Sequence, residues 1–137
     1  MTVLDSSAAI DYLLADDAAT QVAELLTAAG PAAAPDLLVF EVLAVLRREV
    51  ARGGLSQERA EGAVEDLGDL AVELFPTLPL RDRAFELRHN LTVGDALFVA
   101  LAEWLDEPLA TKDRRLATAA REHSRAEIVL LESQTAR

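Results

Sequence analysis

Cysteine is absent from this 137-residue chain, and aromatic residues make up only 4% of it. Disulfides and cysteine-based zinc sites are therefore excluded, and a reducing cytoplasm is the expected location. No apolar run approaches the ~20 residues that span a bilayer, and the N-terminal residues do not have the pattern of a signal peptide. We expect a single domain over residues 1–137 with a core of Leu, Val and Ala, and a loose tail at residues 132–137.

Positive charge is also scarce, because 13 Lys and Arg residues stand against 24 Asp and Glu residues and give a formal net charge of −11. Such a balance argues against a general nucleic-acid binder, since phosphate contacts need a positive surface. Two interpretations of the acidic excess remain. The acidic residues either form a solvated surface, or some of them gather in a site that a cation or a basic partner neutralises.

Short apolar runs alternate with helical patterns along the chain, which is typical of α/β proteins. The first strand is expected at Thr2–Leu4, followed directly by a helix at Ala8–Leu14, and Pro35–Leu38 is either a brief strand or the entry to a helix. Further strands are expected at Val72–Leu80 (near an edge, because it contains two prolines), Pro108–Thr111 and Ile128–Leu131. Further helices are expected between Asp16 and Gly30, at Val39–Arg52, from Ser56 to about Leu70, and at Asp82–His89, Gly94–Leu105 and Arg114–His123. This order predicts a mainly parallel sheet with helices on both faces.

Four acidic residues stand at the start of predicted helices. Asp5 and Asp113 each follow a strand, and the carboxyl ends of parallel strands meet at one edge of a sheet. Glu41 and Asp95 each begin an apolar helical face and should point towards the same packed layer. Each also has a purely structural interpretation. Asp5 and Asp113 can cap a helix, and Asp95 with Thr92 forms a capping-box pattern. Glu41 can lie in the first turn of a helix, where the helix dipole stabilises a negative charge.

Taken together, the four acids favour a shared role. Ionised carboxylates within ~4–6 Å of one another raise each other's pKa, and a divalent cation relieves that repulsion. Ligands that are all oxygen atoms favour Mg²⁺, with Mn²⁺ as the alternative. The spacing therefore predicts a metal site built from Asp5, Glu41, Asp95 and Asp113.

Four segments around these acids resemble a known family. In chain order they are VLDSSAAI, PDLLVFEVLAVLRR, LTVGDALFVALAE and LATKDRRLA. In sequence and spacing they are similar to the PIN-domain ribonucleases, in particular the VapC toxins of bacterial toxin–antitoxin pairs. The resemblance implies a three-layer α/β/α fold around a central, mainly parallel sheet. It also implies an Mg²⁺-dependent endoribonuclease that hydrolyses phosphodiester bonds of a structured RNA of the tRNA or rRNA class.

The resemblance also implies roles for particular residues and partners. Asp5 and Asp95 would be the principal metal ligands, Asp113 would complete the set, and Glu41 would serve as a ligand or position the attacking water. Ser7 and Thr111 match positions where the family carries a hydroxyl beside the pocket; a helix N-cap and a strand-end hydroxyl are equally good interpretations. The expected partners are a second copy of the chain, paired through the helices on either side of Gly30, and a VapB-like antitoxin that covers the pocket.

Several residues bear on substrate binding. Lys112, Arg114 and Arg115 lie next to Asp113 and are candidate phosphate anchors, although a solvated helix start explains them too, and the same holds for Arg47, Arg48 and Arg52. Gly94 and Phe98 stand where relatives often carry larger or hydroxylated side chains, which bears on pocket shape. The isolated His89 and His123 indicate surface or packing residues, and Trp104 indicates interior or interface packing.

Three alternatives compete with the ribonuclease interpretation. A receiver-like signalling domain needs an acidic pair after the first strand, whereas Ser6 and Ser7 follow Asp5 here. A catalytically inactive, protein-binding PIN module is a second alternative. The third is an Mg²⁺ phosphoesterase that acts on DNA or nucleotides.

Overall fold

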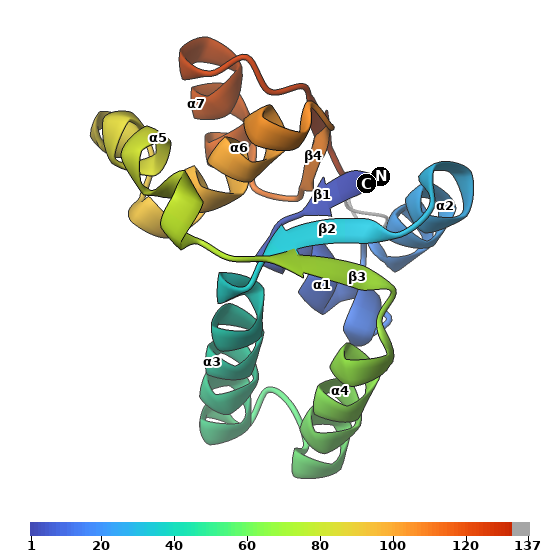
Figure 1. Cartoon of the computed structure of the whole chain (residues 1–137). Helices are drawn as coiled ribbons and strands as arrows, with labels where there is room; N and C mark the ends of the chain where they lie inside the picture. The colour runs from blue at the N-terminus through green and yellow to red at the C-terminus, as the bar shows by residue number, and fades with distance from the viewer. Residues whose placement is uncertain (133–137) are drawn as a thin grey trace.

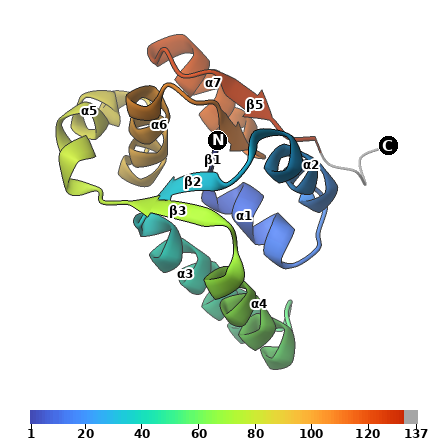
Figure 2. The ribbon, with the colours of Figure 1, turned by 45° about the vertical axis from the view of Figure 1, so that its right-hand side comes forward.

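The computed structural model describes residues 1–132, and its centre is a five-stranded sheet in which all neighbouring strands are parallel. The strand order is β3-β2-β1-β4-β5; Figure 1 labels the first four of these strands and Figure 2 labels β5. The strands are β1 (Thr2–Leu4), β2 (Ala32–Pro35), β3 (Val72–Phe75), β4 (Leu109–Thr111) and β5 (Ile128–Leu130). The predicted α/β fold with a mainly parallel sheet is confirmed.

Helices cover both faces of the sheet and make three layers. The α-helices are α1 (Ser6–Leu13), α2 (Ala19–Ala29), α3 (Leu37–Arg52), α4 (Gln57–Asp69), α5 (Arg81–Glu86), α6 (Val93–Leu105) and α7 (Arg114–His123), and short 3₁₀ turns lie at Leu78–Leu80 and Leu87–His89. Helices α1, α3 and α4 lie on one side of the sheet and α5, α6 and α7 on the other (Figures 1 and 2). This is the arrangement that right-handed crossovers give when the chain first moves outwards from β1 and then returns to β4.

Local sequence fixes several helix starts. Asp5, Ser56, Thr92 and Asp113 each accept a hydrogen bond from a backbone N–H in the first turn of the helix that follows. Such side-chain caps satisfy backbone donors that have no partner inside the helix. The helix predicted at Arg114–His123 therefore begins and ends where expected.

The second strand lies at Ala32–Pro35, one segment earlier than the residues considered for it. Of the two interpretations of Pro35–Leu38, the entry to a helix is confirmed, because α3 begins at Leu37, two residues before the predicted start at Val39. Alanine has low strand propensity, so the run of alanines gave no strand signal. All three alanines are fully buried, and their small side chains suit a strand that packs against helices on both faces. The earlier start also places Glu41 in the second turn of α3, so the first-turn interpretation of Glu41 was wrong.

Other boundaries shift for simple reasons. The strand predicted at Val72–Leu80 ends at Phe75, because Pro76 follows and has no N–H to donate to the ladder. It lies at the edge of the sheet, as predicted. Of the predicted loose tail, Glu132 exchanges backbone hydrogen bonds with the Gln21 side chain, and the remaining residues lie outside the described chain.

The core is rich in alanine and leucine and continues through the sheet into both helical layers. Phe98 on α6 is the largest side chain that is fully buried. Within residues 1–132, no helix combines the length and apolar character needed to cross a membrane.

Candidate active site

Strands β1 and β4 are neighbours, and their carboxyl ends begin the candidate site. The register pairs Leu4 with Ala110, so Asp5 lies level with Thr111, and the Asp5 N–H donates to the Ala110 carbonyl at 3.2 Å. Asp113 follows two residues after Thr111. As predicted, two acids far apart in sequence therefore meet at one edge of the sheet.

A cavity of about 320 Å³ opens at this edge, and all four predicted acids line it. Asp5 comes from the end of β1, Glu41 from α3, Asp95 from the first turn of α6 and Asp113 from the cap of α7. The remaining lining residues are Ser6, Ser7, Phe40, Ala44, Val45 and Arg48. The tertiary structure thus brings together the acids that the sequence analysis selected.

Asp5 is the most buried of the four acids, with 5% of its surface exposed. Its Oδ1 accepts hydrogen bonds from the Ser7 hydroxyl at 2.7 Å and the Ala8 N–H at 3.0 Å, and its Oδ2 accepts one from the Thr111 hydroxyl at 2.5 Å. Burial raises the pKa of Asp5, these hydrogen bonds oppose the rise, and the Asp113 charge adds to it. All three donors are neutral, so the negative charge of Asp5 is solvated but not neutralised.

The hydroxyls of Ser7 and Thr111 hold Asp5, as the resemblance implied. Ser7 does not cap α1, because Asp5 does. Thr111 is fully buried, and its hydroxyl also accepts the N–H of Asp113 at 3.0 Å. Asp113 caps α7 through Oδ1, which accepts from the backbone N–H groups of Arg115 and Leu116. One small network therefore links both strand-end acids.

Helices supply the other two acids. The Thr92 hydroxyl accepts the Asp95 N–H at 3.2 Å, which gives the predicted cap of α6. Burial raises the pKa of Asp95, the Thr92 hydroxyl opposes the rise, and the charges of Asp113 and Asp5 add to it. The charges of Asp5 and Asp113 therefore lie close enough to Asp95 to disfavour its ionised form.

Glu41 lies between α1 and α6. Its Oε1 accepts a hydrogen bond from the Ser6 hydroxyl. A Cβ atom placed on Gly94 would lie 2.8 Å from its Oε2, so the glycine leaves room for this carboxylate. Gly94 thus affects the shape of the site, whereas Phe98 belongs to the core and does not line the cavity.

The four carboxylates share a cavity without converging on one point. Among residues 1–132, no group of three His, Cys, Asp or Glu side chains already stands at metal-holding distances. The donor set nevertheless fits a hard divalent cation, because every candidate ligand is an oxygen atom and two of the acids have raised pKa values. Metal binding at this site remains a prediction.

The predicted basic residues have different surroundings. Arg48 lines the cavity, whereas Arg114 and Arg115 are exposed at the start of α7 beside Asp113. Lys112 forms an ion pair with Asp11, with 2.8 Å between Nζ and Oδ2, and is not among the lining residues. Arg52 pairs with Glu49, and Arg47 is exposed. The RNA-binding roles of these residues stay predictions.

Two isolated predictions concern residues outside the site. His89 and His123 are both exposed, in agreement with surface positions. Trp104 is 67% exposed, so interior packing is wrong for it and interface packing stays a prediction.

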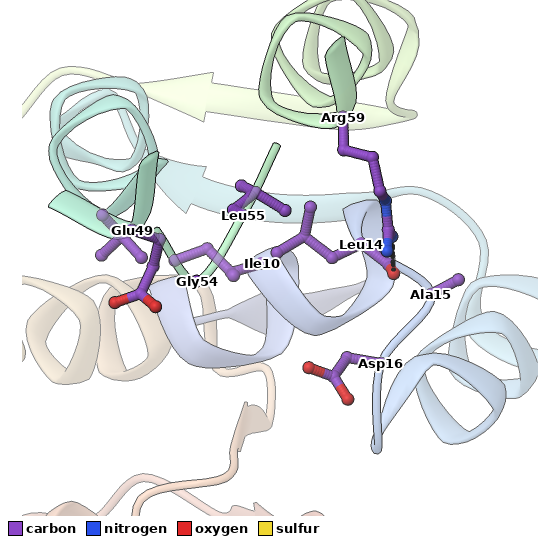
Figure 3. Close-up of a pocket in the computed structure, with 9 residues that line it drawn as sticks. Ile10, Leu14, Ala15, Asp16, Glu49, Gly54, Leu55 and Arg59 are labelled. Atoms are coloured by element: carbon purple, nitrogen blue, oxygen red, sulfur yellow. Dashed lines mark hydrogen bonds between the residues drawn. The ribbon is translucent and has the colours of Figure 1, made fainter. Parts of the chain in front are cut away.

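A second cavity of about 420 Å³ lies between α1, α3 and α4 (Figure 3). Its lining combines apolar side chains with the charged Asp16, Glu49 and Arg59, and Arg59 crosses it to donate to the Leu14 carbonyl at 2.6 Å. The carboxylates of Asp16 and Glu49 lie well apart in Figure 3 and do not point towards one another. The four predicted acids therefore line the smaller cavity at the sheet edge and not this one.

Sequence reasoning did not select Ser6, Phe40 or the partner of Lys112. Ser6 adjoins Asp5 and Phe40 adjoins Glu41, so proximity to a predicted acid was the available signal. The pairing of Lys112 with Asp11 joins positions 101 residues apart, and no local pattern announces it.

The family model of the PIN domain matches residues 2–122. The chain belongs to the PIN-domain family. It is 42% identical over 118 residues to Ribonuclease VapC1 of Mycobacterium tuberculosis, a match that covers 85% of this chain and 89% of that protein. It is 36% identical over 129 residues to Ribonuclease VapC12 of the same organism, covering 94% and 99%. The predicted family, a VapC-type PIN protein, is confirmed.

Solved structures of PIN proteins share the fold. The VapBC2 structure from Rickettsia felis, bound to a DNA fragment from its promoter, aligns with a TM-score of 0.70 and 13% identity over 96% of this chain and 98% of that chain. VapC20 of Mycobacterium tuberculosis, described as a sarcin–ricin loop cleaving toxin, aligns with a TM-score of 0.61 and 21% identity over 87% and 95%. Membership of this family excludes the receiver-like alternative.

Proposed function

We propose that this PIN-domain protein is an Mg²⁺-dependent endoribonuclease and the toxin of a toxin–antitoxin pair. The observation that carries the proposal is the single cavity lined by Asp5, Glu41, Asp95 and Asp113, which four separate segments bring to the carboxyl edge of the sheet. The VapC relatives named as ribonucleases support the reaction class.

The residues divide the work in a way that follows from their surroundings. Among residues 1–132, no cationic side chain pairs with Asp5 or Asp95, and these two acids are proposed as the principal ligands of Mg²⁺ or Mn²⁺. A bound divalent cation supplies a Lewis acid for water and for the phosphate oxygens. Asp113 would complete the ligand set while its Oδ1 caps α7.

Glu41 is proposed to hold the cation or accept a proton from the attacking water. Its Oε1 is oriented by Ser6, and the cavity wall beside it carries Arg48, which can contact a phosphate. Ser7 and Thr111 hold Asp5 in place. Such hydrogen bonds to a ligand commonly matter ~10–100-fold for metal affinity or activity.

The substrate proposed is a structured RNA of the tRNA or rRNA class. VapC20, which shares the fold, is described as cleaving the sarcin–ricin loop. The net charge of −11 predicts weak sequence-independent RNA affinity. Recognition would then depend on the shape of a loop and its unpaired bases.

Two protein partners are proposed. A VapB-like antitoxin would cover the acidic cavity with a basic side chain, and VapBC2 of Rickettsia felis shares the fold. A second copy would pair through α3, whose outer face exposes Val39, Phe40 and Leu43. Helix α2, the other helix considered for pairing, packs its Leu25 and Leu26 against the core of its own chain.

The test is RNA cleavage by the purified protein with Mg²⁺, Mn²⁺ or EDTA, using tRNA, rRNA fragments, single-stranded DNA and a nucleotide in parallel. Asp5→Asn and Asp95→Asn should each lower the cleavage rate at least ~100-fold, because each removes a ligand charge. Asp82→Asn, which changes an exposed acid on α5, should cleave like the parent.

Each other outcome of this test selects an alternative. Equal rates for the parent and both ligand variants would contradict the site assignment. Cleavage of DNA or the nucleotide in preference to RNA would favour the phosphoesterase interpretation. If none of the RNAs is cleaved in the presence of either metal, the result would favour an inactive, protein-binding PIN module.

A further inference from the structure

Lys112 is the only lysine in the sequence, and it joins two points of α1. Its backbone N–H donates to the Ser7 hydroxyl at 3.0 Å, and its ammonium group donates to Asp11 Oδ2 at 2.8 Å. Ser7 and Asp11 lie one helical turn apart on α1. One residue therefore fixes the end of β4 against α1 both beside the acidic cavity and one turn further along the helix.

The hydrogen bonds at the cavity end continue to the acids. Ser7, which receives the Lys112 N–H, donates to Asp5 Oδ1 at 2.7 Å. Thr111, the preceding residue, donates to Asp5 Oδ2 at 2.5 Å and accepts from the Asp113 N–H at 3.0 Å. Displacement of residue 112 along α1 would disturb both hydroxyls that hold Asp5.

The far end is anchored in a buried acidic position. Asp11 is 7% exposed, and its Oδ2 also accepts the Ala18 N–H at 3.0 Å, which fixes the turn between α1 and α2. Asp17 lies 3.9 Å from the same ammonium group. The hydrogen bond with Asp11, helped by the charges of Asp17 and Asp16, raises the pKa of Lys112.

These surroundings distinguish Lys112 from a phosphate anchor. An anchor needs an ammonium group that is available to an incoming anion. The Lys112 ammonium group instead lies among carboxylates that would repel an RNA phosphate. The contacts of Lys112 serve the arrangement of the protein itself.

We propose that the Lys112–Asp11 ion pair is a positioning device for the acidic cavity, which sets the end of β4 on α1 so that Ser7 and Thr111 hold Asp5. The inference rests on the proposed function for its link to catalysis. It assigns Lys112 and Asp11 as positioning residues that do not touch RNA.

The experiment compares Lys112→Met, Asp11→Asn, the double variant and Lys112→Arg with the parent. Asp16→Asn is the control, because it removes one negative charge from the turn that follows α1 and Asp16 is exposed, whereas Asp11 is buried on α1. Four quantities are measured for each protein: the Mn²⁺ dissociation constant by calorimetry, kcat and KM for RNA cleavage, and the hydrogen-exchange rate of the amide at residue 112. Circular dichroism checks that each variant is folded.

The two single variants and the double variant should behave alike. Each should bind Mn²⁺ about 10-fold more weakly and show a kcat about 10-fold lower, with little change in KM. The Lys112 amide should exchange about 10-fold faster in Asp11→Asn than in Asp16→Asn. The double variant should be no worse than either single variant, because the two residues act as one unit. Lys112→Arg, which keeps the charge, should restore most of the parent behaviour.

A phosphate anchor would give a different pattern. Lys112→Met would then raise KM and reduce the slope of log RNA affinity against log salt concentration by about 1. Asp11→Asn would keep the kcat and KM of the parent, and neither variant would change the Mn²⁺ affinity. That result, or an unchanged Lys112 amide in Asp11→Asn, would overturn the proposal. Failure of the parent to cleave RNA would contradict only the proposed function, because amide exchange reports on the ion pair without RNA or metal.

Discussion

The two ends of α6 carry acids in opposite circumstances. At the N-terminal end, Asp95 lies among Asp5 and Asp113, and its pKa is raised by burial and by their charges. At the C-terminal end, Glu103 is only 7% exposed, yet its pKa is lowered because Arg83 binds it. Arg83 contacts both carboxylate oxygens, at 2.7 and 3.0 Å, and the Arg125 N–H donates to Glu103 at 3.1 Å.

The difference shows what each buried acid does for the protein. Glu103 is neutralised within the chain and ties α6 to α5 and to the turn after α7. Asp5 and Asp95 are not neutralised in this way, so their ionised forms cost the folded state free energy. Acids kept in that condition at a cavity are characteristic of functional sites. One helix thus joins a stabilising end to the end that carries the proposed active site.

Glu103→Gln should produce the largest loss of stability. It removes the charge that holds Arg83, and because the Arg83 side chain is partly exposed the cost should be about 1–2 kcal/mol, below that of a fully buried pair. The free energy of unfolding in urea measures this loss. Glu86→Gln is the matched control, because Glu86 also contacts Arg83 but is exposed, and it should cost less than ~0.5 kcal/mol. Equal effects of the two variants would contradict the contrast between the ends of α6.

The pH dependence of stability should separate the two ends. The lowered pKa of Glu103 gives stability that is present above its ordinary value of 4.5 and is lost as pH falls below it. The raised pKa values of Asp5 and Asp95 act in the opposite sense. Their contribution is present below 3.8 and is lost as pH rises through the folded-state values.

Urea midpoints measured between pH 2 and pH 7 would show this separation. Glu103→Gln should flatten the loss of stability on the acid side, and Asp5→Asn should not. Parallel curves for the parent and Glu103→Gln would argue against the assigned role of the Arg83 pair.

Asp5→Asn should stabilise the protein while it abolishes cleavage. Asparagine caps a helix as well as aspartate does and removes a buried charge. We expect a gain on the order of 1 kcal/mol at pH 7, or a melting temperature about 3–5 °C higher, measured without divalent metal. The gain should vanish near pH 3, where the parent Asp5 is protonated. A lower melting temperature at pH 7 would show that the charge is compensated.

Gly94→Ala should give the smallest change in stability. Alanine favours a helix by about 0.5–1 kcal/mol, but its Cβ would displace the Glu41 carboxylate. RNA cleavage should therefore fall about 10-fold. Gly62→Ala on α4 is the control, because a Cβ there meets no atom within 4 Å. Gly62→Ala should gain the full helix-propensity increment of about 0.5–1 kcal/mol and keep full cleavage activity. Thermal unfolding measures the first quantity and initial cleavage rates measure the second.

Local sequence was a good guide where one short segment carries the information. The sequence predicted the change from strand to helix at Asp5 and at Asp113, and the helix cap at Thr92, because each depends on a few neighbouring residues. The strand at Ala32–Pro35 could not be predicted from the sequence, since alanine favours helices. The segment forms a strand only because it is buried between two helical layers and pairs with β1 and β3. The position of Glu41 within α3 shifted for the same reason, because the end of that strand sets where the helix begins.

The sequence by itself determined that acids would stand at the carboxyl edge of a parallel sheet, since strand ends and helix caps are local properties. Only the tertiary structure decided which acids keep their charge uncompensated. Glu103 meets Arg83 across 20 residues and Asp11 meets Lys112 across 101, whereas Asp5 meets hydroxyls and other acids. Whether a buried carboxylate stabilises the fold or is left for function depends on which charge lies within a few ångströms. That distance is set by packing, not by position along the chain.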